Sequence, residues 1–236
     1  MIGLQAFARY GAALMLAAAT AKGAVRPAVV ELYTSQGCSS CPPADALLGE
    51  ISGRDDVLAL AFHVDYWDRL GWRDPFSLPA SKERQLNYVR RFGKDWVYTP
   101  DIVIDGNTDV LGVDRQTLLQ RLKAPRSGVP VHVLVEHEDL VVSVDAASGE
   151  KVSEVVLIGY APSAVTAIGQ GENAGRSLHE FNIVRSFTTL GLWHGEAAKW
   201  RVRLDSLPAD AARVAVLVQQ PGPGPIVGAV SAEVAR

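Results

Sequence analysis

The first half of the chain, up to about residue 122, alternates continuous apolar runs with amphipathic stretches. Continuous runs rich in β-branched residues are typical of strands buried on both faces, whereas apolar residues three or four positions apart are typical of helices. The pattern therefore predicts the order strand, helix, strand, helix, strand, strand, helix. The predicted elements are 28–33, 42–53, 57–64, 80–92, 101–104, 108–111 and 114–122, with a hairpin turn at Asp105-Gly106-Asn107.

After a Pro- and Gly-containing stretch at 125–130, the pattern changes to short alternating segments separated by turn signals. Such segments are typical of antiparallel strands with one buried face. The predicted strands are 131–135, 140–144, 154–160, 182–187, 200–204, 213–218 and 226–230. We therefore expect an α/β domain at 25–125, followed at 126–236 by a small antiparallel β-sandwich-like domain.

The first 24 residues have a separate pattern. Arg9 precedes the apolar stretch Tyr10–Ala19, and Ala19-Thr20-Ala21 has the small-x-small form that a signal peptidase accepts. The apolar stretch is too short to span a bilayer. We expect residues 1–24 to be a signal peptide cleaved after Ala21 or Ala24, and the protein to be periplasmic or secreted. The alternative is that the segment stays uncleaved and anchors the protein. Apart from such an anchor, we expect no association with a membrane.

Composition narrows the classes of partner. The chain has 236 residues, 48% of them hydrophobic, and a formal net charge of −3. Its Lys and Arg residues are scattered, so no basic stripe for nucleic acid is present. The loop Gly169–Asn173 is not a dinucleotide fingerprint because no βαβ pattern surrounds it. We expect no cofactor.

The two cysteines, Cys38 and Cys41, are three positions apart. A disulfide that closes so small a ring stabilises a fold by only about 2 kcal/mol, so redox chemistry is the better reason for the pair. At the start of a helix, free N–H groups and the dipole favour a thiolate. We expect Cys38 to attack and the less accessible Cys41 to resolve the mixed disulfide, with Ser39 and Ser40 donating hydrogen bonds to the thiolate.

These features together resemble a thioredoxin fold. The strand order agrees, Cys-x-x-Cys follows the first strand, and Thr99-Pro100 precedes the hairpin. The longer segments VELYTSQGCSSCPPAD, HVDYWDRLGWRDPF, YTPDIVIDG and ENAGRSLHEFNIVRSFTTLGLW resemble one uncharacterised, exported, thioredoxin-like family, domain of unknown function 1223. The resemblance implies a mixed central sheet flanked by helices. It also implies a cis-proline at Pro100 facing the cysteines, with Thr99 positioning an extended substrate.

The chain departs from a standard thioredoxin at two places. The buried acidic residue usually found six positions before the first cysteine is replaced by Leu32, and Glu31 lies on the opposite face of the strand. The spacer Ser39-Ser40 matches neither a reducing nor a strongly oxidising pair. The direction of electron flow is therefore left open.

An aromatic and charged loop follows His63, at 65–79. Its Trp67 and Trp72 are candidates for one wall of a substrate groove beside the cysteines, and a packed lid explains them nearly as well. His63 with Cys38 and Cys41 would also make a three-ligand site for Cu(I). In the second half, Arg185 is expected to pair with Glu180 or Glu172.

The sequence thus predicts a thiol–disulfide oxidoreductase that acts on protein or small-molecule disulfides through Cys38, Cys41 and Pro100. A copper-binding accessory protein is the first alternative, and a non-catalytic binding module is the second. The substrate, the redox partner and the oligomeric state are not given by the sequence.

Overall fold

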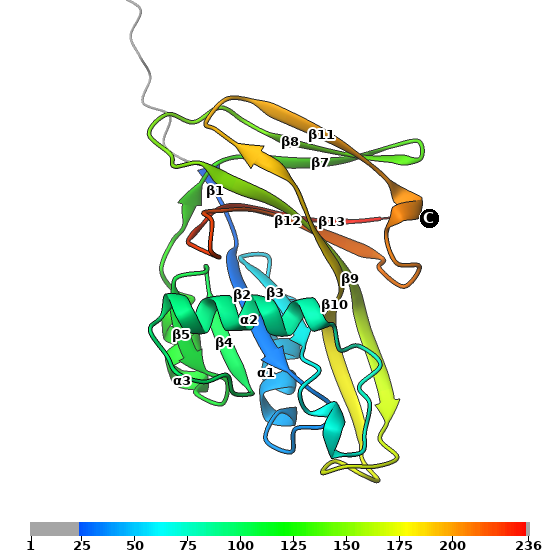
Figure 1. The fold of residues 1–236 in the computed structure, drawn as a ribbon. Helices are drawn as coiled ribbons and strands as arrows, with labels where there is room; N and C mark the ends of the chain where they lie inside the picture. The colour runs from blue at the N-terminus through cyan, green and yellow to red at the C-terminus, as the bar shows by residue number, and fades with distance from the viewer. Residues whose placement is uncertain (1–23, 235–236) are drawn as a thin grey trace, which may run out of the picture.

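The computed structural model describes residues 24–234 as a mixed α/β protein built on one large sheet (Figure 1). Residues 1–23 of the predicted signal peptide, with the predicted cleavage after Ala21, lie outside the described residues, and Ala24, the other predicted cleavage position, is the first described residue. The helices are α1 (Pro42–Ser52), α2 (Pro79–Arg91) and α3 (Arg115–Arg121), with short 3₁₀ turns at Asp68–Leu70 and Leu204–Ser206. The strands are β1 (Ala24–Val25), β2 (Ala28–Thr34), β3 (Val57–His63), β4 (Asp101–Ile104), β5 (Thr108–Leu111), β6 (Ser127–Gly128), β7 (Val131–Glu136), β8 (Asp139–Val144), β9 (Ser153–Ala167), β10 (Ser177–Trp193), β11 (Ala198–Arg203), β12 (Arg213–Gln219) and β13 (Ile226–Glu233).

The large sheet has eight strands in the order β13-β12-β9-β10-β3-β2-β4-β5. β3 is parallel to both β2 and β10, and the other neighbours are antiparallel. The pairing of Ile183 in β10 with Ala61 in β3 joins the two halves of the chain. The predicted boundary at residue 125 therefore separates sequence regions that share one sheet, and the 125–130 stretch itself contributes β6, which pairs with β1.

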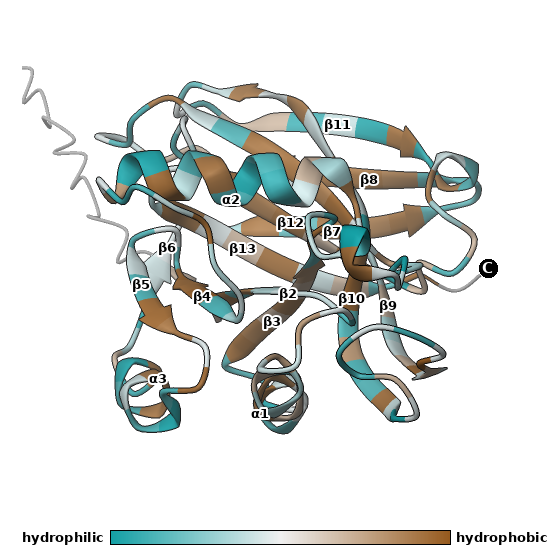
Figure 2. Ribbon diagram, turned by 60° about the horizontal axis from the view of Figure 1, so that its bottom comes forward, coloured by the Kyte–Doolittle hydropathy of each residue, from teal (hydrophilic) through white to brown (hydrophobic). Residues whose placement is uncertain are grey.

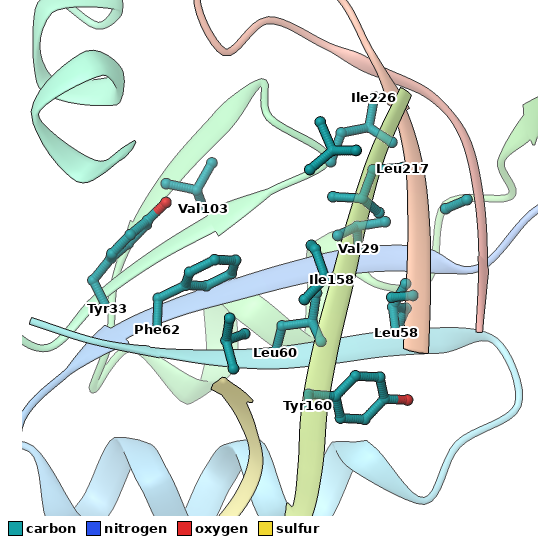
Figure 3. Packing of buried hydrophobic residues seen from close by; sticks show 14 of the residues in the cluster. Val29, Tyr33, Leu58, Leu60, Phe62, Val103, Ile158, Tyr160, Leu217 and Ile226 are labelled. Carbon is teal, nitrogen blue, oxygen red and sulfur yellow. The ribbon is translucent and has the colours of Figure 1, made fainter. Parts of the chain in front are cut away.

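Every residue of β2 and β3 is buried, as their continuous apolar runs predicted. Alternate side chains go to opposite faces. One face carries Val29, Tyr33 and Phe62 (Figure 3). This face packs with Tyr88 of α2. Side chains of the other face pack against α1 and α3. In Figure 2, β3 is hydrophobic along most of its length, whereas α2 alternates between the two colours because only one of its sides is buried.

A second, three-stranded sheet, β11-β8-β7, is antiparallel. Its Leu140, Val142 and Val144 pack with apolar side chains of β9 and β12. This layering gives the second half the sheet-on-sheet packing expected from its alternating pattern.

Local signals in the sequence set several element boundaries. Asp114 caps α3 by accepting a hydrogen bond from the Thr117 N–H at 3.0 Å. Asp105 and Gly106 both have positive φ, 54° and 64°, as a tight hairpin turn requires. The predicted start of the helix at Asp114 and the predicted hairpin turn at Asp105-Gly106 are therefore confirmed.

The largest difference from the predicted elements is the length of β9 and β10. They form a hairpin of 15- and 17-residue strands, where the sequence indicated segments of six or seven residues. The hairpin extends past the end of β3 toward the loop that follows it (Figure 1). No described helix is long and apolar enough to cross a membrane.

Candidate functional site

Cys38 and Cys41 form a disulfide at the junction between β2 and α1, with their Cα atoms 5.4 Å apart. Neither side chain has exposed surface, although Ser39 and Ser40 between them are exposed. The prediction that Cys38 would be the more accessible cysteine is therefore wrong for this oxidised form. Exchange at these sulfurs requires the turn to open.

The first turn of α1 offers few free N–H groups. Pro42 and Pro43 have none, and the N–H groups of Ala44 and Asp45 both donate to the Cys41 carbonyl oxygen, at 2.8 and 3.1 Å. The expectation that free helix N–H groups favour a thiolate is therefore not met in this turn. Of the two expected influences, only the helix dipole still favours a thiolate here.

The Thr99–Pro100 peptide bond is cis, as predicted, and lies against the disulfide. The Thr99 carbonyl oxygen is 3.8 Å from Cys38 Sγ. Ser40 Oγ lies 3.3 Å from that sulfur and 3.5 Å from the Thr99 carbonyl oxygen. Gly112 packs directly on the proline: a Cβ at Gly112 would come within 2.6 Å of the Pro100 Cβ and 2.8 Å of its carbonyl oxygen. The proline and the cysteine turn thus form one contiguous site.

The tip of the β9–β10 hairpin, residues 168–176, holds the cysteine turn from the side of the second half of the chain. Asn173 is buried, and its side-chain amide donates to the carbonyl oxygens of Gln36 and Cys38, both at 2.9 Å. Because both acceptors are backbone atoms of the loop before α1, Asn173 fixes the path of that loop. Sequence reasoning missed this residue, since it lies 135 positions from Cys38.

The same tip places a carboxylate beside the site. Glu172 Oε2 accepts a hydrogen bond at 3.1 Å from the Ser39 N–H. Hydrogen bonding by the Ser39 side chain, together with this backbone bond, holds the pKa of Glu172 below its usual range. Trp72 packs against Gly171 and donates its Nε1 proton to the Gln36 side chain at 2.9 Å. Of the two predicted groove residues, Trp72 thus packs on the hairpin tip, whereas Trp67 donates to Thr99 Oγ1 at 2.8 Å.

A fully buried polar cluster surrounds His63. The imidazole Nδ1 lies 2.7 Å from Asp74 Oδ2, and Nε2 lies 3.7 Å from Glu180 Oε1. Burial alone lowers the pKa of His63, but the attraction of Asp74, Glu180 and Asp45 outweighs it and raises the pKa to about 9. Glu180 in turn accepts a hydrogen bond at 2.7 Å from the Gln36 side chain. A charged imidazolium is therefore the preferred state of His63 at neutral pH.

Asp45 is the acidic member of this cluster nearest to the cysteines in sequence. It lies in the first turn of α1, four residues after Cys41, and is 7% exposed. Burial raises its pKa to about 7, against the opposing attraction of His63. The sequence pattern gave no reason to single out this aspartate, because one acidic residue in a first helical turn is ordinary.

Glu31 lies on the opposite sheet face from Leu32, as predicted. It is fully buried and accepts bonds from Arg84 at 2.7 and 2.9 Å, and from the hydroxyl groups of Tyr33 and Tyr88. Its carboxylate therefore belongs to an ion-pair cluster that joins β2 to α2. It is not directed toward the cysteines.

The predicted pairing of Arg185 is wrong. Arg185 pairs with Asp210 at 2.7 Å, while Glu180 and Glu172 bind the cysteine loop as described above. The β9–β10 hairpin still docks on the first half of the chain, through different residues from those expected.

Between residues 24 and 234, no group of three or more His, Cys, Asp or Glu side chains is arranged to hold a metal ion. The Cu(I) set of Cys38, Cys41 and His63 stays a prediction. Its donors do not fit a metal in the conformation described, because the cysteines are joined and both nitrogens of His63 face carboxylates.

The fold and the site together define a mixed α/β protein with a disulfide-bonded Cys-x-x-Cys turn at the start of a helix. The chain belongs to the family described as "Protein of unknown function (DUF1223)", which matches residues 29–219. The sequence matches no curated protein.

Two solved structures are similar. The crystal structure of protein AGR_C_4864 from Agrobacterium tumefaciens is 29% identical, with a TM-score of 0.77 over 90% of this chain and 99% of that one. HBP35 of Porphyromonas gingivalis is 13% identical, with a TM-score of 0.64 over 90% of this chain and 77% of that one. The second similarity concerns the fold alone.

Proposed function

We propose that this protein is an exported, thioredoxin-like protein that exchanges thiols and disulfides through the Cys38–Cys41 pair. The observation that carries the proposal is the contact between Cys38 Sγ and the Thr99 carbonyl oxygen, 3.8 Å apart, beside the cis bond to Pro100. A cysteine pair that served only as a staple would gain nothing from a preformed backbone edge at the sulfur. A substrate in an extended conformation would use that edge for hydrogen bonds.

In the oxidised form, a substrate thiolate attacks Cys38 Sγ. The Cys38–Cys41 bond breaks, a mixed disulfide forms at Cys38, and Cys41 leaves as a thiolate that takes up a proton. A second substrate thiol then attacks the substrate sulfur, which forms the substrate disulfide and releases Cys38. Two electrons and two protons pass from two thiols to the cysteine pair, and the reverse sequence reduces a disulfide.

The burial of both sulfurs sets a condition on this reaction. Ser39 and Ser40 are exposed, and the turn is held by Asn173 and Glu172 from the hairpin tip. We infer that exchange begins when the 38–41 turn separates from this tip. Opening of a short turn costs far less than unfolding, since only a few hydrogen bonds are broken.

Export is part of the proposal. The signal-like residues 1–24 would direct the protein to the periplasm or outside the cell, where a disulfide persists. A protein disulfide or a small-molecule disulfide would be the substrate there, and a separate redox partner would recycle the pair.

Trapping of the mixed disulfide tests the proposed function. The reduced wild-type protein, Cys38→Ser and Cys41→Ser are each incubated with glutathione disulfide, and adducts are measured by mass spectrometry. We expect Cys41→Ser to accumulate one adduct on Cys38, Cys38→Ser to react at least about tenfold more slowly, and the wild type to proceed to its internal disulfide. Equal reactivity of the two single variants would contradict the assigned roles, and no reaction in any form would refute the function.

A further inference from the structure

A cavity of about 410 Å³ is lined in part by Thr99, the residue before Pro100. Its wall includes the aromatic rings of Tyr66, Trp67 and Tyr98. The volume falls within the range of cavities that bind small molecules. The sequence predicted Trp67 in the wall of a substrate groove and Thr99 as a substrate-positioning residue, but neither the sequence signals nor the similar proteins described above indicate which class of ligand this cavity takes.

Thr99 connects the cavity to the disulfide. The residue lines the cavity, and its carbonyl oxygen lies 3.8 Å from Cys38 Sγ. Trp67 is fixed in the wall by its 2.8 Å hydrogen bond to Thr99 Oγ1. A molecule with a sulfur at Cys38 and a substituent on the Thr99 side would therefore place that substituent in the cavity.

The cavity wall carries two cations, Arg69 and Lys82, and its described lining includes no acidic side chain. Neither cation forms a salt bridge with any residue between 24 and 234, whereas the nearby cations Arg84 and Lys94 are paired with Glu31 and Asp109. Unpaired cations beside aromatic rings in a concave site favour an anionic ligand.

Acidic groups also lie near the cavity, and their charges affect where an anionic ligand can bind. Asp65 and Asp101 influence Tyr66 in the cavity wall, and burial raises the pKa of Asp101 to about 7, so part of its charge is lost at neutral pH. Glu172, which is not part of the cavity lining, presents an exposed carboxylate at the Ser39 N–H. An anionic substituent is therefore disfavoured beside Glu172 and favoured beside Arg69 and Lys82.

We propose that this cavity binds the carboxylate of an anionic thiol or disulfide substrate, with Arg69 and Lys82 as the anion-binding residues and Trp67 as a contact surface. This inference rests on the proposed exchange function and specifies its substrate class. The carboxylate belongs either to a free peptide thiol or to an acidic residue next to a cysteine in a protein, and the two sources share the same chemistry at the cavity.

The first experiment compares three disulfides that differ in charge: glutathione disulfide, which is anionic, hydroxyethyl disulfide, which is neutral, and cystamine, which is cationic. The second-order rate with the reduced protein is measured for each and divided by its uncatalysed rate with dithiothreitol. We expect the order anionic, neutral, cationic, with at least about a tenfold preference for the first over the third at low ionic strength. An absence of charge preference, or the opposite order, would overturn the proposal.

The second experiment removes the two positive charges to test whether they cause the preference for an anionic disulfide. In the double variant Arg69→Gln/Lys82→Gln, the ratio of the anionic to the neutral rate is expected to fall about tenfold. Arg91→Gln is the matched control, since Arg91 is an exposed cation on the same helix as Lys82 but outside the cavity lining. An unchanged ratio in the double variant, or an equal fall in the control, would refute the assignment.

A binding measurement separates this inference from the function on which it rests. S-methylglutathione carries the carboxylates but cannot exchange. We expect it to quench tryptophan fluorescence of the wild type saturably, with the quenching lost in Trp67→Phe and weakened about tenfold in the double variant. Binding without exchange would contradict the proposed function alone, whereas exchange without binding would contradict the cavity assignment alone.

A blocked peptide disulfide with aspartate beside the cysteine distinguishes the two sources. A charge preference that matches that of glutathione disulfide would indicate protein substrates, and a preference confined to glutathione disulfide would indicate a free peptide thiol. Either result is consistent with the anion site. If the exchange rates of both substrates were unchanged in the Arg69→Gln/Lys82→Gln variant, the site would be excluded.

Discussion

The side-chain amide of Asn173 donates a 2.9 Å hydrogen bond to the carbonyl oxygen of Cys38. This bond connects the tip of the β9–β10 hairpin to the disulfide-bonded cysteine turn, across 135 positions of sequence. The second half of the chain therefore does more than extend the sheet, because it supplies part of the wall around the cysteines.

The variant Asn173→Ala should loosen the cysteine turn. Removal of the amide takes one donor from each of two buried carbonyl oxygens, of which that of Cys38 keeps the Cys41 N–H at 3.2 Å, so we expect a loss of about 1–3 kcal/mol in the free energy of unfolding. We also expect faster reduction of the disulfide by dithiothreitol, because the turn opens more often. Gln170→Ala, an exposed change in the same tip, is the control. Equal reduction rates for all three proteins would show that the tip does not restrain the turn.

Glu172→Gln should change the ionisation of Cys38. The Glu172 carboxylate accepts the hydrogen bond of the Ser39 N–H, next to Cys38. A negative charge at this position disfavours a thiolate on Cys38. We expect the variant to lower the pKa of Cys38 in the reduced protein, as followed by thiolate absorbance at 240 nm. Glu150→Gln removes an exposed carboxylate outside the hairpin tip and should leave the titration unchanged. A raised Cys38 pKa in Glu172→Gln would mean that the carboxylate acts through the turn's structure instead of its charge.

His63 should make stability dependent on pH above neutrality. Its pKa is raised from 6.5 to about 9 in the folded protein, so its contribution is fully present below about pH 6.5 and is lost as pH rises through 9. The shift corresponds to about 3 kcal/mol as an upper bound. We expect the oxidised wild type to lose stability to urea between pH 7 and 9.5, and His63→Gln to be less stable at pH 7 with a much flatter profile.

Three acidic groups face His63: Asp74, Glu180 and Asp45. Asp45 has a pKa of about 7, so its own titration affects stability mainly below pH 7 and leaves the higher range to the histidine. Parallel profiles for wild type and His63→Gln above pH 7 would contradict the charged state assigned to His63.

Gly112→Ala should disturb the site through Pro100. The added Cβ would lie 2.6 Å from the Pro100 Cβ and 2.8 Å from its carbonyl oxygen, so the backbone at Thr99–Pro100 has to shift. We expect a destabilisation of about 1–3 kcal/mol and slower exchange with glutathione disulfide. Gly53→Ala is the matched control, because nothing lies within 4 Å of its added Cβ. Normal exchange in Gly112→Ala would show that the position of Thr99 is unimportant for the reaction.

Much of the fold was predictable because its signals are local. The buried runs of β2 and β3, the Asp114 cap, the Asp105-Gly106 turn and the cis bond at Pro100 all lie where the sequence indicated. The parallel pairing of β10 with β3 was not predictable in this way. It depends on contacts between distant segments, and the alternating pattern of β10 says which face is buried but not which strand lies beside it.

The same distinction between local signals and contacts of distant segments applies to the candidate site. The cysteine pair and Pro100 stand out by residue type and spacing, whereas Asn173, Glu172 and Asp45 are ordinary polar residues whose role comes only from position. The burial of Cys38 also could not be inferred, since it is produced by the turn packing against Thr99 and the distant hairpin tip.

The central claim is that Cys38 and Cys41 cycle between disulfide and dithiol in the native protein. The most direct test is equilibration of the folded protein in glutathione redox buffers, with the two states quantified by alkylation and mass spectrometry. The account predicts reversible, two-electron conversion with one reduction potential, reached from both directions, in the range of about −270 to −120 mV spanned by known exchange proteins. A disulfide that stays intact across these buffers, and opens only when the protein unfolds, would contradict it.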